Sequence, residues 1–210
     1  MAADDTFRSV RSEASGLYKE KGSRFISIIY PVSSEAEIKE ILENVRKEYH
    51  DARHHCYAYI LGANQEAWRA NDDGEPSGTA GKPILGQIRS AGLTNVIIVV
   101  IRYFGGTLLG VSGLINAYRT AAASAISNAD IMVNIIHETV ELYFPYTAMN
   151  DVMKIIKEEN IIQSQHSFDL QCNMTISFRS SARERITSRL ERIEGLTYKT
   201  AGSEPVPGQD

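Results

Sequence analysis

The second half of the chain carries the hydrophobic pattern that most restricts its fold. Apolar residues alternate with polar ones in a segment around Val140–Phe144 and again in Cys172–Phe178, as is typical of half-buried strands. Apolar stripes at helical spacing follow each of these segments, and shorter strand-like segments begin at Ile161 and Leu196. The resulting order β-α-β-β-α-β predicts a ferredoxin-like domain.

The first half is predicted to form a separate α+β domain. Alternating segments between Phe7 and Tyr30 indicate short antiparallel strands, and a capping box of Ser34 and Glu37 opens the amphipathic helix that follows. The apolar run from Val96 to Ile101 is typical of a strand buried on both faces. The overall fold class is therefore α+β with two domains, at residues 1–132 and 133–201, followed by a flexible tail at 202–210.

Composition limits the class of protein. The chain has 210 residues, of which 43% are hydrophobic and 23% charged, as in an ordinary soluble protein. It has no apolar stretch of the ~18 residues that a membrane span needs, and its acidic start lacks a secretory signal. Its two cysteines, Cys56 and Cys172, form neither a disulfide framework nor a zinc cluster. We therefore expect a cytoplasmic protein with no membrane contact, no metal and no cofactor.

The charge balance gives little support to nucleic-acid binding by the whole chain. The net charge is −4, and neither half has the basic excess expected of a domain that neutralises phosphates. A local patch remains a weak candidate for nucleic-acid binding; the alternative is a solvated helix face. Its members are Arg179, Arg183, Arg185, Arg189 and Arg192.

The segment Asn71–Pro83 (NDDGEPSGTAGKP) is the first candidate for a functional surface. It follows a strand predicted at His54–Leu61 and precedes a helix predicted from Pro83, and such connections usually run only ~4–6 residues. Its glycines and prolines indicate a shaped loop. It could be a rigid turn or a recognition surface, and its carboxylates could cap the helix or, more weakly, bind a hard cation. The candidate residues are Asp72, Asp73, Gly74, Glu75, Pro76, Ser77, Gly78, Thr79 and Lys82.

Two neighbouring segments complete the candidate surface. His54 shares a strand face with Cys56, but no further ligands or catalytic partners are evident, so we expect a partly buried histidine that is hydrogen-bonded beneath the loop. A glycine-rich segment follows the buried strand where nucleotide-binding loops occur, yet it matches neither standard phosphate-binding motif. The candidates here are Arg102, Tyr103, Phe104, Gly105 and Gly106.

Three motifs in this order resemble the IMPACT/YigZ family: Arg53–Tyr59, Asn71–Leu85 and Arg102–Gly110. The resemblance covers roughly residues 7–125, and residues 138–200 are similar to the small C-terminal domain of bacterial members. It implies an N-terminal domain like those of ribosomal proteins and translation factors, and a ferredoxin-like domain similar to the last one of elongation factor G. It also implies a link to translation, because eukaryotic relatives compete for an activator of a starvation-sensing initiation-factor kinase.

These observations predict a non-enzymatic binding or regulatory protein linked to translation. Its partner would be RNA, the ribosome or a translation-related protein, and no residue is assigned a catalytic role. One alternative is a nucleotide- or metal-dependent enzyme that uses the Asp72–Pro83 loop with His54 and Cys56. The other is a protein-interaction adaptor that does not bind nucleic acid.

Overall fold

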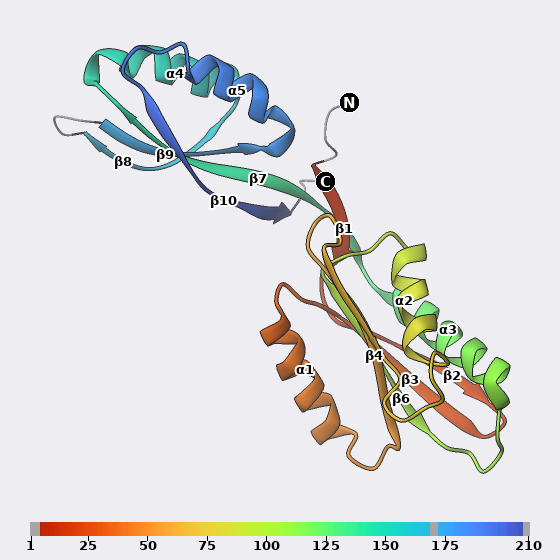
Figure 1. The fold of residues 1–210 in the computed structure, drawn as a ribbon. Coiled ribbons are helices and arrows are strands. Elements are labelled where there is room, and N and C mark those ends of the chain that lie inside the picture. The colour runs from red at the N-terminus through yellow and green to blue at the C-terminus, as the bar shows by residue number, and fades with distance from the viewer. Residues whose placement is uncertain (1–4, 169–171, 208–210) are drawn as a thin grey trace. The chain divides into compact units, whose positions relative to one another are not determined.

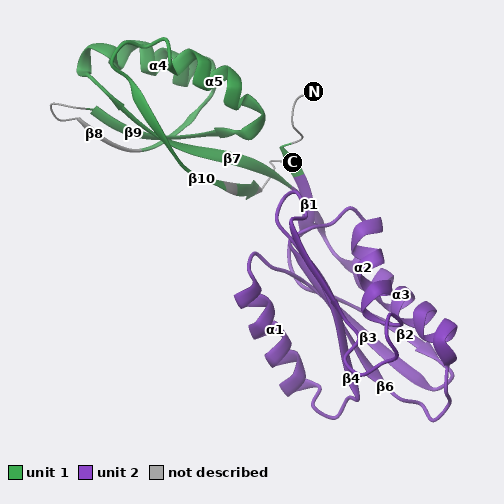
Figure 2. Cartoon of the chain, viewed as in Figure 1, with its two compact units in different colours: residues 1–6, 134–210 green, residues 7–133 purple. Residues whose placement is uncertain are grey.

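The fold was analysed in a computed structural model that describes residues 5–168 and 172–207. The chain divides into two compact units, one of residues 7–133 and one of residues 1–6 with 134–210 (Figure 2). Each contains a β-sheet with helices packed on it, so the α+β class is confirmed. Strand β1 (Thr6–Val10) spans the boundary between the units. Within the described residues, no helix is both long and apolar enough to cross a membrane.

The unit of residues 7–133 is built on an antiparallel sheet with the order β2-β3-β6-β4-β5. The apolar run predicted to be buried on both faces lies in the central strand β6. The strands are β2 (Ala14–Glu20), β3 (Ser23–Pro31), β4 (His54–Leu61), β5 (Ala67–Asn71) and β6 (Val96–Tyr103).

Helices cover both faces of this sheet (Figure 1). Helix α1 (Glu35–Glu48) packs on one face, and helices α2 (Gly81–Ser90) and α3 (Gly110–Asn128) pack on the other. The alternation in β4 divides its side chains between two cores, with Cys56 on the α2/α3 side and Tyr57 on the α1 side. The central strand β6 is therefore apolar from Val96 to Ile101, because neither of its faces meets water there.

The capping box predicted at the start of α1 is present. The Glu37 N–H donates to Ser34 Oγ at 3.3 Å, and the Glu37 carboxylate accepts a hydrogen bond from the Ser33 N–H at 2.6 Å. The returning bond thus comes from Ser33 and not from Ser34. Satisfying these free N–H groups fixes where the helix begins.

The other unit has the predicted ferredoxin-like order of elements. Four strands of its sheet pair antiparallel in the order β10-β7-β9-β8, β1 also pairs with β7, and helices α4 and α5 contribute to the core. A single 3₁₀ turn precedes each helix, at Tyr146–Ala148 and Ser180–Ala182. The elements are β7 (Ile131–Phe144), α4 (Met149–Glu158), β8 (Ile162–Phe168), β9 (Cys172–Arg179), α5 (Arg183–Leu190) and β10 (Thr197–Pro207).

The prediction of a flexible tail at 202–210 is wrong for residues 202–207, which belong to a strand. Strand β10 continues to Pro207 and pairs with β7, with a register shift between Thr200 and Gly202. Backbone hydrogen bonds hold this part of the strand, so it needs no apolar pattern, and an edge strand tolerates proline. The last three predicted tail residues, 208–210, lie outside the described residues.

Three smaller predictions also need correction. The spacing of Ser181 and Glu184 also predicts a capping box, but Ser181 does not cap α5. The N-cap is Ala182, which makes no side-chain hydrogen bond, and the Ser181 N–H donates to the Asp5 carboxylate at 3.3 Å. Helix α2 begins at Gly81, two residues before the predicted start at Pro83. The long predicted loop is shortened by strand β5.

Candidate functional site

A pocket of ≈ 370 Å³ lies where the end of β6 and the start of β4 meet the start of α3. The segment Asn71–Pro83, which we call the acidic loop, also lines it. We call this pocket the Arg102 pocket. It combines charged side chains with a group of apolar ones. Its lining residues are Arg53, His54, Gly74, Glu75, Pro76, Arg102, Phe104, Leu108, Leu109, Gly110, Val111 and Leu114.

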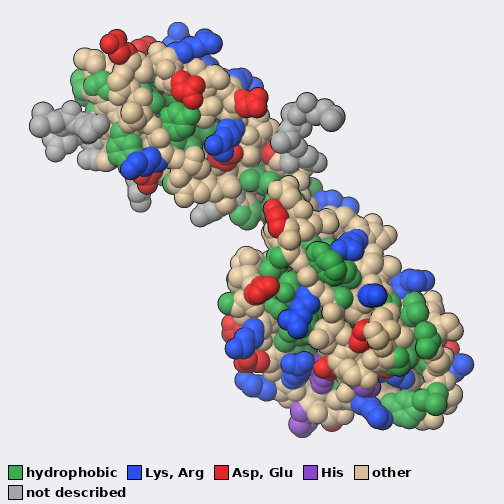
Figure 3. Space-filling model, viewed as in Figure 1, with side chains coloured by type: hydrophobic (Ala, Val, Ile, Leu, Met, Phe, Trp, Pro, Cys, Tyr) green, Lys and Arg blue, Asp and Glu red, His purple; other side chains and the backbone are tan. Residues whose placement is uncertain are grey.

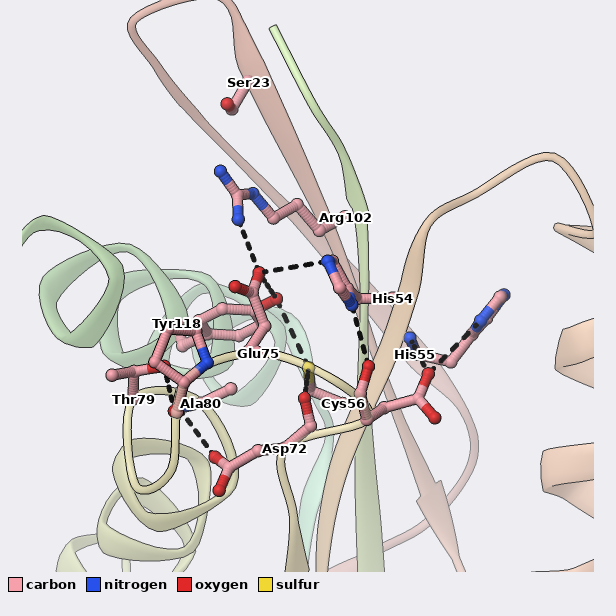
Figure 4. A network of polar contacts seen from close by, with 12 residues as sticks. Ser23, His54, His55, Cys56, Asp72, Glu75, Thr79, Ala80, Arg102 and Tyr118 are labelled. Carbon is pink, nitrogen blue, oxygen red and sulfur yellow. Dashed lines mark hydrogen bonds and ion pairs between the residues drawn. The ribbon is translucent and has the colours of Figure 1, made fainter. Parts of the chain in front are cut away.

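A buried carboxylate joins the charged groups at this pocket. Glu75 Oε1 accepts a hydrogen bond from Arg102 Nη1 at 2.5 Å and another from the Tyr118 hydroxyl at 2.8 Å. His54 Nε2 lies 3.9 Å from the same oxygen. Figure 4 shows Glu75 between these three side chains. Since the charges of Glu75 and Arg102 are both buried, each depends on the other for compensation.

The Arg102 guanidinium has more donors than this partner can use. Its side chain is only 7% exposed, and Glu75 is the hydrogen-bond acceptor found for it among the described residues. Within the same residues, its buried Nε–H has no acceptor. The guanidinium carbon lies 5.4 Å from the ring centroid of Phe25 and 5.7 Å from that of Phe104. A buried donor without a partner is uncommon in folded proteins.

The hydrogen bonds of His54 fix its tautomer. Its Nδ1 lies 2.7 Å from the Asp73 carbonyl oxygen, which can only accept, so Nδ1 carries the hydrogen. This is the partly buried histidine beneath the loop that the sequence predicts. Its other ring nitrogen, Nε2, faces the Glu75 carboxylate. The loop thereby holds the ring in one orientation at the pocket.

The Cys56 thiol is unsuited to nucleophilic chemistry. Its Sγ lies 3.0 Å from the Asp72 carbonyl oxygen and 3.3 Å from the Tyr118 hydroxyl. Burial raises the pKa of Cys56, and the negative charges of Glu75, Asp73 and Asp72 raise it further. The thiol therefore remains protonated, whereas a nucleophilic cysteine reacts as the thiolate.

Two of the three loop carboxylates hold the backbone of their own unit. Asp72 Oδ1 accepts hydrogen bonds from the N–H groups of Ala80 and Gly81 at 3.0 and 2.8 Å, at the start of α2. Its other oxygen accepts from the Gly78 N–H at 2.8 Å. The predicted helix-capping carboxylate is therefore Asp72.

Asp73 has a similar structural role. Its Oδ2 accepts the His55 N–H at 2.7 Å, and its Oδ1 lies 3.4 Å from Arg46 Nη2. Its own φ is 41°, and that of Gly74 is 85°. The loop therefore turns sharply between β5 and α2, and short or flexible side chains suit that conformation.

Some of the remaining residues of the acidic loop stabilise the loop itself, and others line the Arg102 pocket. The buried Thr79 donates from its hydroxyl to the Pro76 carbonyl oxygen at 2.6 Å. Ser77 and Lys82 are exposed, and neither lines the Arg102 pocket. The structure therefore does not bring Asp72, Asp73 and Lys82 together with Arg102 in one cleft, and the loop reaches the pocket through Gly74, Glu75 and Pro76.

The glycine-rich segment after β6 is anchored at its start and apolar beyond it. The Tyr103 hydroxyl donates to Asp51 at 2.8 Å, and the Gly105 N–H donates to Ser23 Oγ at 3.2 Å. Gly106 is exposed with a φ of 85°. Three large apolar side chains of this region are exposed, and we call them the apolar rim. They are Phe104 at 44%, Leu108 at 84% and Val111 at 60%.

Within the described residues, no group of three or more His, Cys, Asp or Glu side chains is placed to hold a metal ion. The acidic loop offers no such set because Asp72 and Asp73 already accept backbone and arginine hydrogen bonds. The cation interpretation of the loop therefore gains no support from the geometry.

Four of the five arginines proposed as a nucleic-acid patch form ion pairs in the unit of residues 1–6 and 134–210, which we call the C-terminal unit. Figure 3 shows acidic and basic side chains interspersed on the visible face of this unit. Such pairing reduces the positive potential available to phosphates. The pairs are Arg179–Asp5, Arg183–Glu138, Arg185–Glu159 and Arg189 with both Glu158 and Glu159.

Sequence reasoning missed several residues of the site. Tyr118 lies on the alanine-rich face of α3. A single tyrosine among small side chains was the one sequence feature that could have indicated its polar role at Glu75. Arg53 and Leu114 line the pocket without any distinctive local motif. The apolar rim residues Leu108 and Val111 lie in or next to the glycine-rich segment, where the glycines, and not the apolar residues, gave the prediction. No short motif could have joined these positions, because they come from separate elements.

A family model described as the Impact N-terminal domain matches residues 21–126. The chain belongs to the IMPACT family. It is similar to the IMPACT family member YvyE of Bacillus subtilis, with 30% identity over 184 residues, 88% of this chain and 82% of YvyE. It is also similar to the IMPACT family member YigZ of Escherichia coli, with 46% identity over 100 residues, 47% of this chain and 49% of YigZ.

A solved structure supports the fold of the whole chain. The crystal structure of a hypothetical protein matches with a TM-score of 0.69 and 25% sequence identity. The match covers 94% of this chain and 98% of the other. The shared architecture therefore includes both units, and the IMPACT family domain accounts for most of the unit that holds the Arg102 pocket.

Proposed function

We propose that this IMPACT family member is a non-enzymatic binding protein linked to translation, and that it engages a protein partner at the Arg102 pocket. The observation that carries the proposal is the apolar rim of Phe104, Leu108 and Val111 beside a pocket with a buried ion pair. Exposed apolar side chains grouped at one place commonly mark sites of protein association. Buried arginine and aromatic side chains are typical anchors of such interfaces.

The chemistry of the pocket favours binding over catalysis. The Cys56 thiol remains protonated, and Asp72 and Asp73 are bound to backbone N–H groups. The Glu75 oxygen that faces Arg102 also accepts from Tyr118, whose pKa burial raises, so that hydroxyl stays a donor. The link to translation comes from the resemblance to eukaryotic IMPACT proteins.

A retention experiment tests this proposal. The full chain would be immobilised and incubated with purified ribosomes and ribosome-associated proteins, with and without nuclease, and the retained proteins would be identified by mass spectrometry. We expect a translation protein to be retained in both conditions. Leu108→Asp should abolish retention because it places a charge in the apolar rim, whereas Leu17→Asp, at a 50% exposed leucine of β2, should not.

Two outcomes would contradict the proposal. Retention that disappears after nuclease treatment would indicate RNA as the direct partner. Retention that survives Leu108→Asp would place the contact elsewhere on the molecule. Circular dichroism of both aspartate variants would verify that they remain folded, as expected for substitutions at exposed positions.

A further inference from the structure

We infer that the Arg102 pocket recognises a carboxylate carried beside an apolar side chain, as in the apolar C-terminus of a partner or an internal acidic residue flanked by apolar ones. The inference rests on the proposed function and specifies the chemistry of the partner. It depends on three features of the pocket: the first turn of α3, the unused donors of Arg102 and the apolar lining.

The first turn of α3 supplies positive electrostatic potential. Gly110 and Val111 line the pocket and begin a helix of 19 residues. The first turn contains no acidic residue, and the N-cap Leu109 provides no side-chain hydrogen bond. The N–H groups of a first turn have no partner within the helix, and the helix dipole favours an anion there.

Arg102 independently indicates an acidic ligand. Its side chain is over nine-tenths buried and lines the pocket, and a single oxygen of Glu75 is the hydrogen-bond acceptor found for it among the described residues. Its Nε–H lacks an acceptor in the same part of the chain. Guanidinium groups can bind a carboxylate through two parallel hydrogen bonds, and this one has donors left for a second acid.

The charge balance of the pocket also favours an anion. Glu75 offsets the charge of Arg102, and the Tyr118 hydroxyl donates to the same carboxylate oxygen. Arg53, for which no ion pair is found among the described residues, and the start of α3 then remain as the positive groups of the lining. An incoming carboxylate therefore meets a net positive site even though Glu75 is close.

The apolar lining requires the acid to be attached to an apolar group. Phe104, Leu108 and Leu109 form one part of the wall, and Leu114 is buried beside them. A bare inorganic anion would leave these side chains in contact with water. A pocket of ≈ 370 Å³ lies at the small end of the range typical of ligand sites, so it suits one side chain and its acid and not a folded domain.

Titrations of the full chain with short peptides test the inference. The probes are acetyl-Gly-Leu-Phe with a free carboxylate, its C-terminal amide, and the internally acidic acetyl-Leu-Asp-Phe amide. We expect at least one acid to bind about tenfold or more tightly than the amide. In ¹H–¹⁵N spectra, the acid should shift the Arg102 Nε–H signal and the amides of Gly110 and Val111.

The two acidic peptides separate the two sources of the carboxylate. Tighter binding of the free-carboxylate peptide would indicate recognition of a chain terminus, and tighter binding of the aspartyl peptide would indicate an internal acid. Leu108→Ser should lower the affinity for the preferred acidic peptide, and Leu17→Ser should leave that affinity unchanged. Arg102→Lys keeps the charge but removes the Nε–H and the fork geometry, so it should reduce the preference for acid over amide.

Equal affinity for acid and amide would overturn the inference, as would binding that leaves the Arg102 Nε–H and α3 signals unmoved. If a translation protein is nevertheless retained through Leu108, the proposed function stands and only the carboxylate chemistry fails. If the acid binds as expected but no protein is retained, the inference stands and the proposed link to translation fails.

Discussion

At the scale of single residues, the carboxylates of this chain act mainly by holding other groups in place. Asp72 caps α2, and Glu75 compensates the buried charge of Arg102. In the C-terminal unit, Asp5 accepts two hydrogen bonds from the Arg179 guanidinium, at 2.8 and 3.0 Å. Such charge-assisted, two-pronged contacts are stronger than neutral hydrogen bonds.

The Asp5 contact predicts a specific pH dependence of stability. The hydrogen bonds from Arg179 lower the pKa of Asp5 from 3.8 to about 2. Because the folded-state pKa is depressed, the stabilisation is complete above 3.8 and is lost as the pH falls towards 2. Asp5→Asn should therefore reduce the free energy of unfolding by about 1–2 kcal/mol near neutral pH, and this difference should shrink in acid.

Urea unfolding followed by circular dichroism at several pH values would measure this difference. Asp130→Asn is the matched control, since the Asp130–Arg11 pair has a similar separation, 2.9 Å, but both of its side chains are exposed. Exposed pairs contribute little, so this substitution should have almost no effect at any pH. A loss for Asp5→Asn that is the same at pH 7 and in acid would refute the linkage.

At the scale of the elements, the start of α2 depends on the absence of a side chain at Gly81. A Cβ there would lie 2.5 Å from the Asn71 backbone nitrogen, whereas one at Gly86 in the same helix would meet nothing within 4 Å. Gly81→Ala should therefore destabilise the chain by about 1–3 kcal/mol through overpacking. Gly86→Ala should stabilise it by about 0.5–1 kcal/mol through helix propensity.

Thermal unfolding of the two alanine variants tests the close approach of α2 to β5. The melting temperature should fall for Gly81→Ala and rise for Gly86→Ala. Equal shifts in the same direction would show that the segments are not held together as closely as 2.5 Å implies.

Elements with a strong hydrophobic periodicity could be predicted from the sequence. Elements that are stabilised mainly by backbone hydrogen bonds to a neighbouring strand could not. The alternation around Cys172–Phe178 and the run Val96–Ile101 both gave strands because burial requires that pattern. Strand β5 and the end of β10 were missed because both lie at sheet edges, where few side chains are buried. Edge pairing depends on a neighbouring strand, which local sequence does not specify.

The candidate site shows the same division. The sequence indicated the acidic loop, His54 and Arg102 because unusual local composition marked them. It did not indicate that Asp72 would face α2 while Glu75 would face Arg102. Neighbouring residues of a loop can point in opposite directions, and only the packing of β4, β6 and α3 decides which carboxylate reaches the pocket.

At the scale of the whole molecule, the two units have separate hydrophobic cores. Those of residues 7–133 include Phe25, Ile97 and Tyr118, and that of the other unit includes Phe144 and Leu142. None of the buried core clusters found among the described residues mixes side chains from both units. This arrangement allows stability and binding to be assigned to one unit at a time.

The separate cores also assign one thiol to each unit. Cys56 is buried beneath the acidic loop, and Cys172 is buried in the core of the C-terminal unit. A thiol reagent can modify either only after the surrounding structure opens. The labelling rate of Cys56 therefore reports how often the structure around the acidic loop opens. The labelling rate of Cys172 reports how often the core of the C-terminal unit opens.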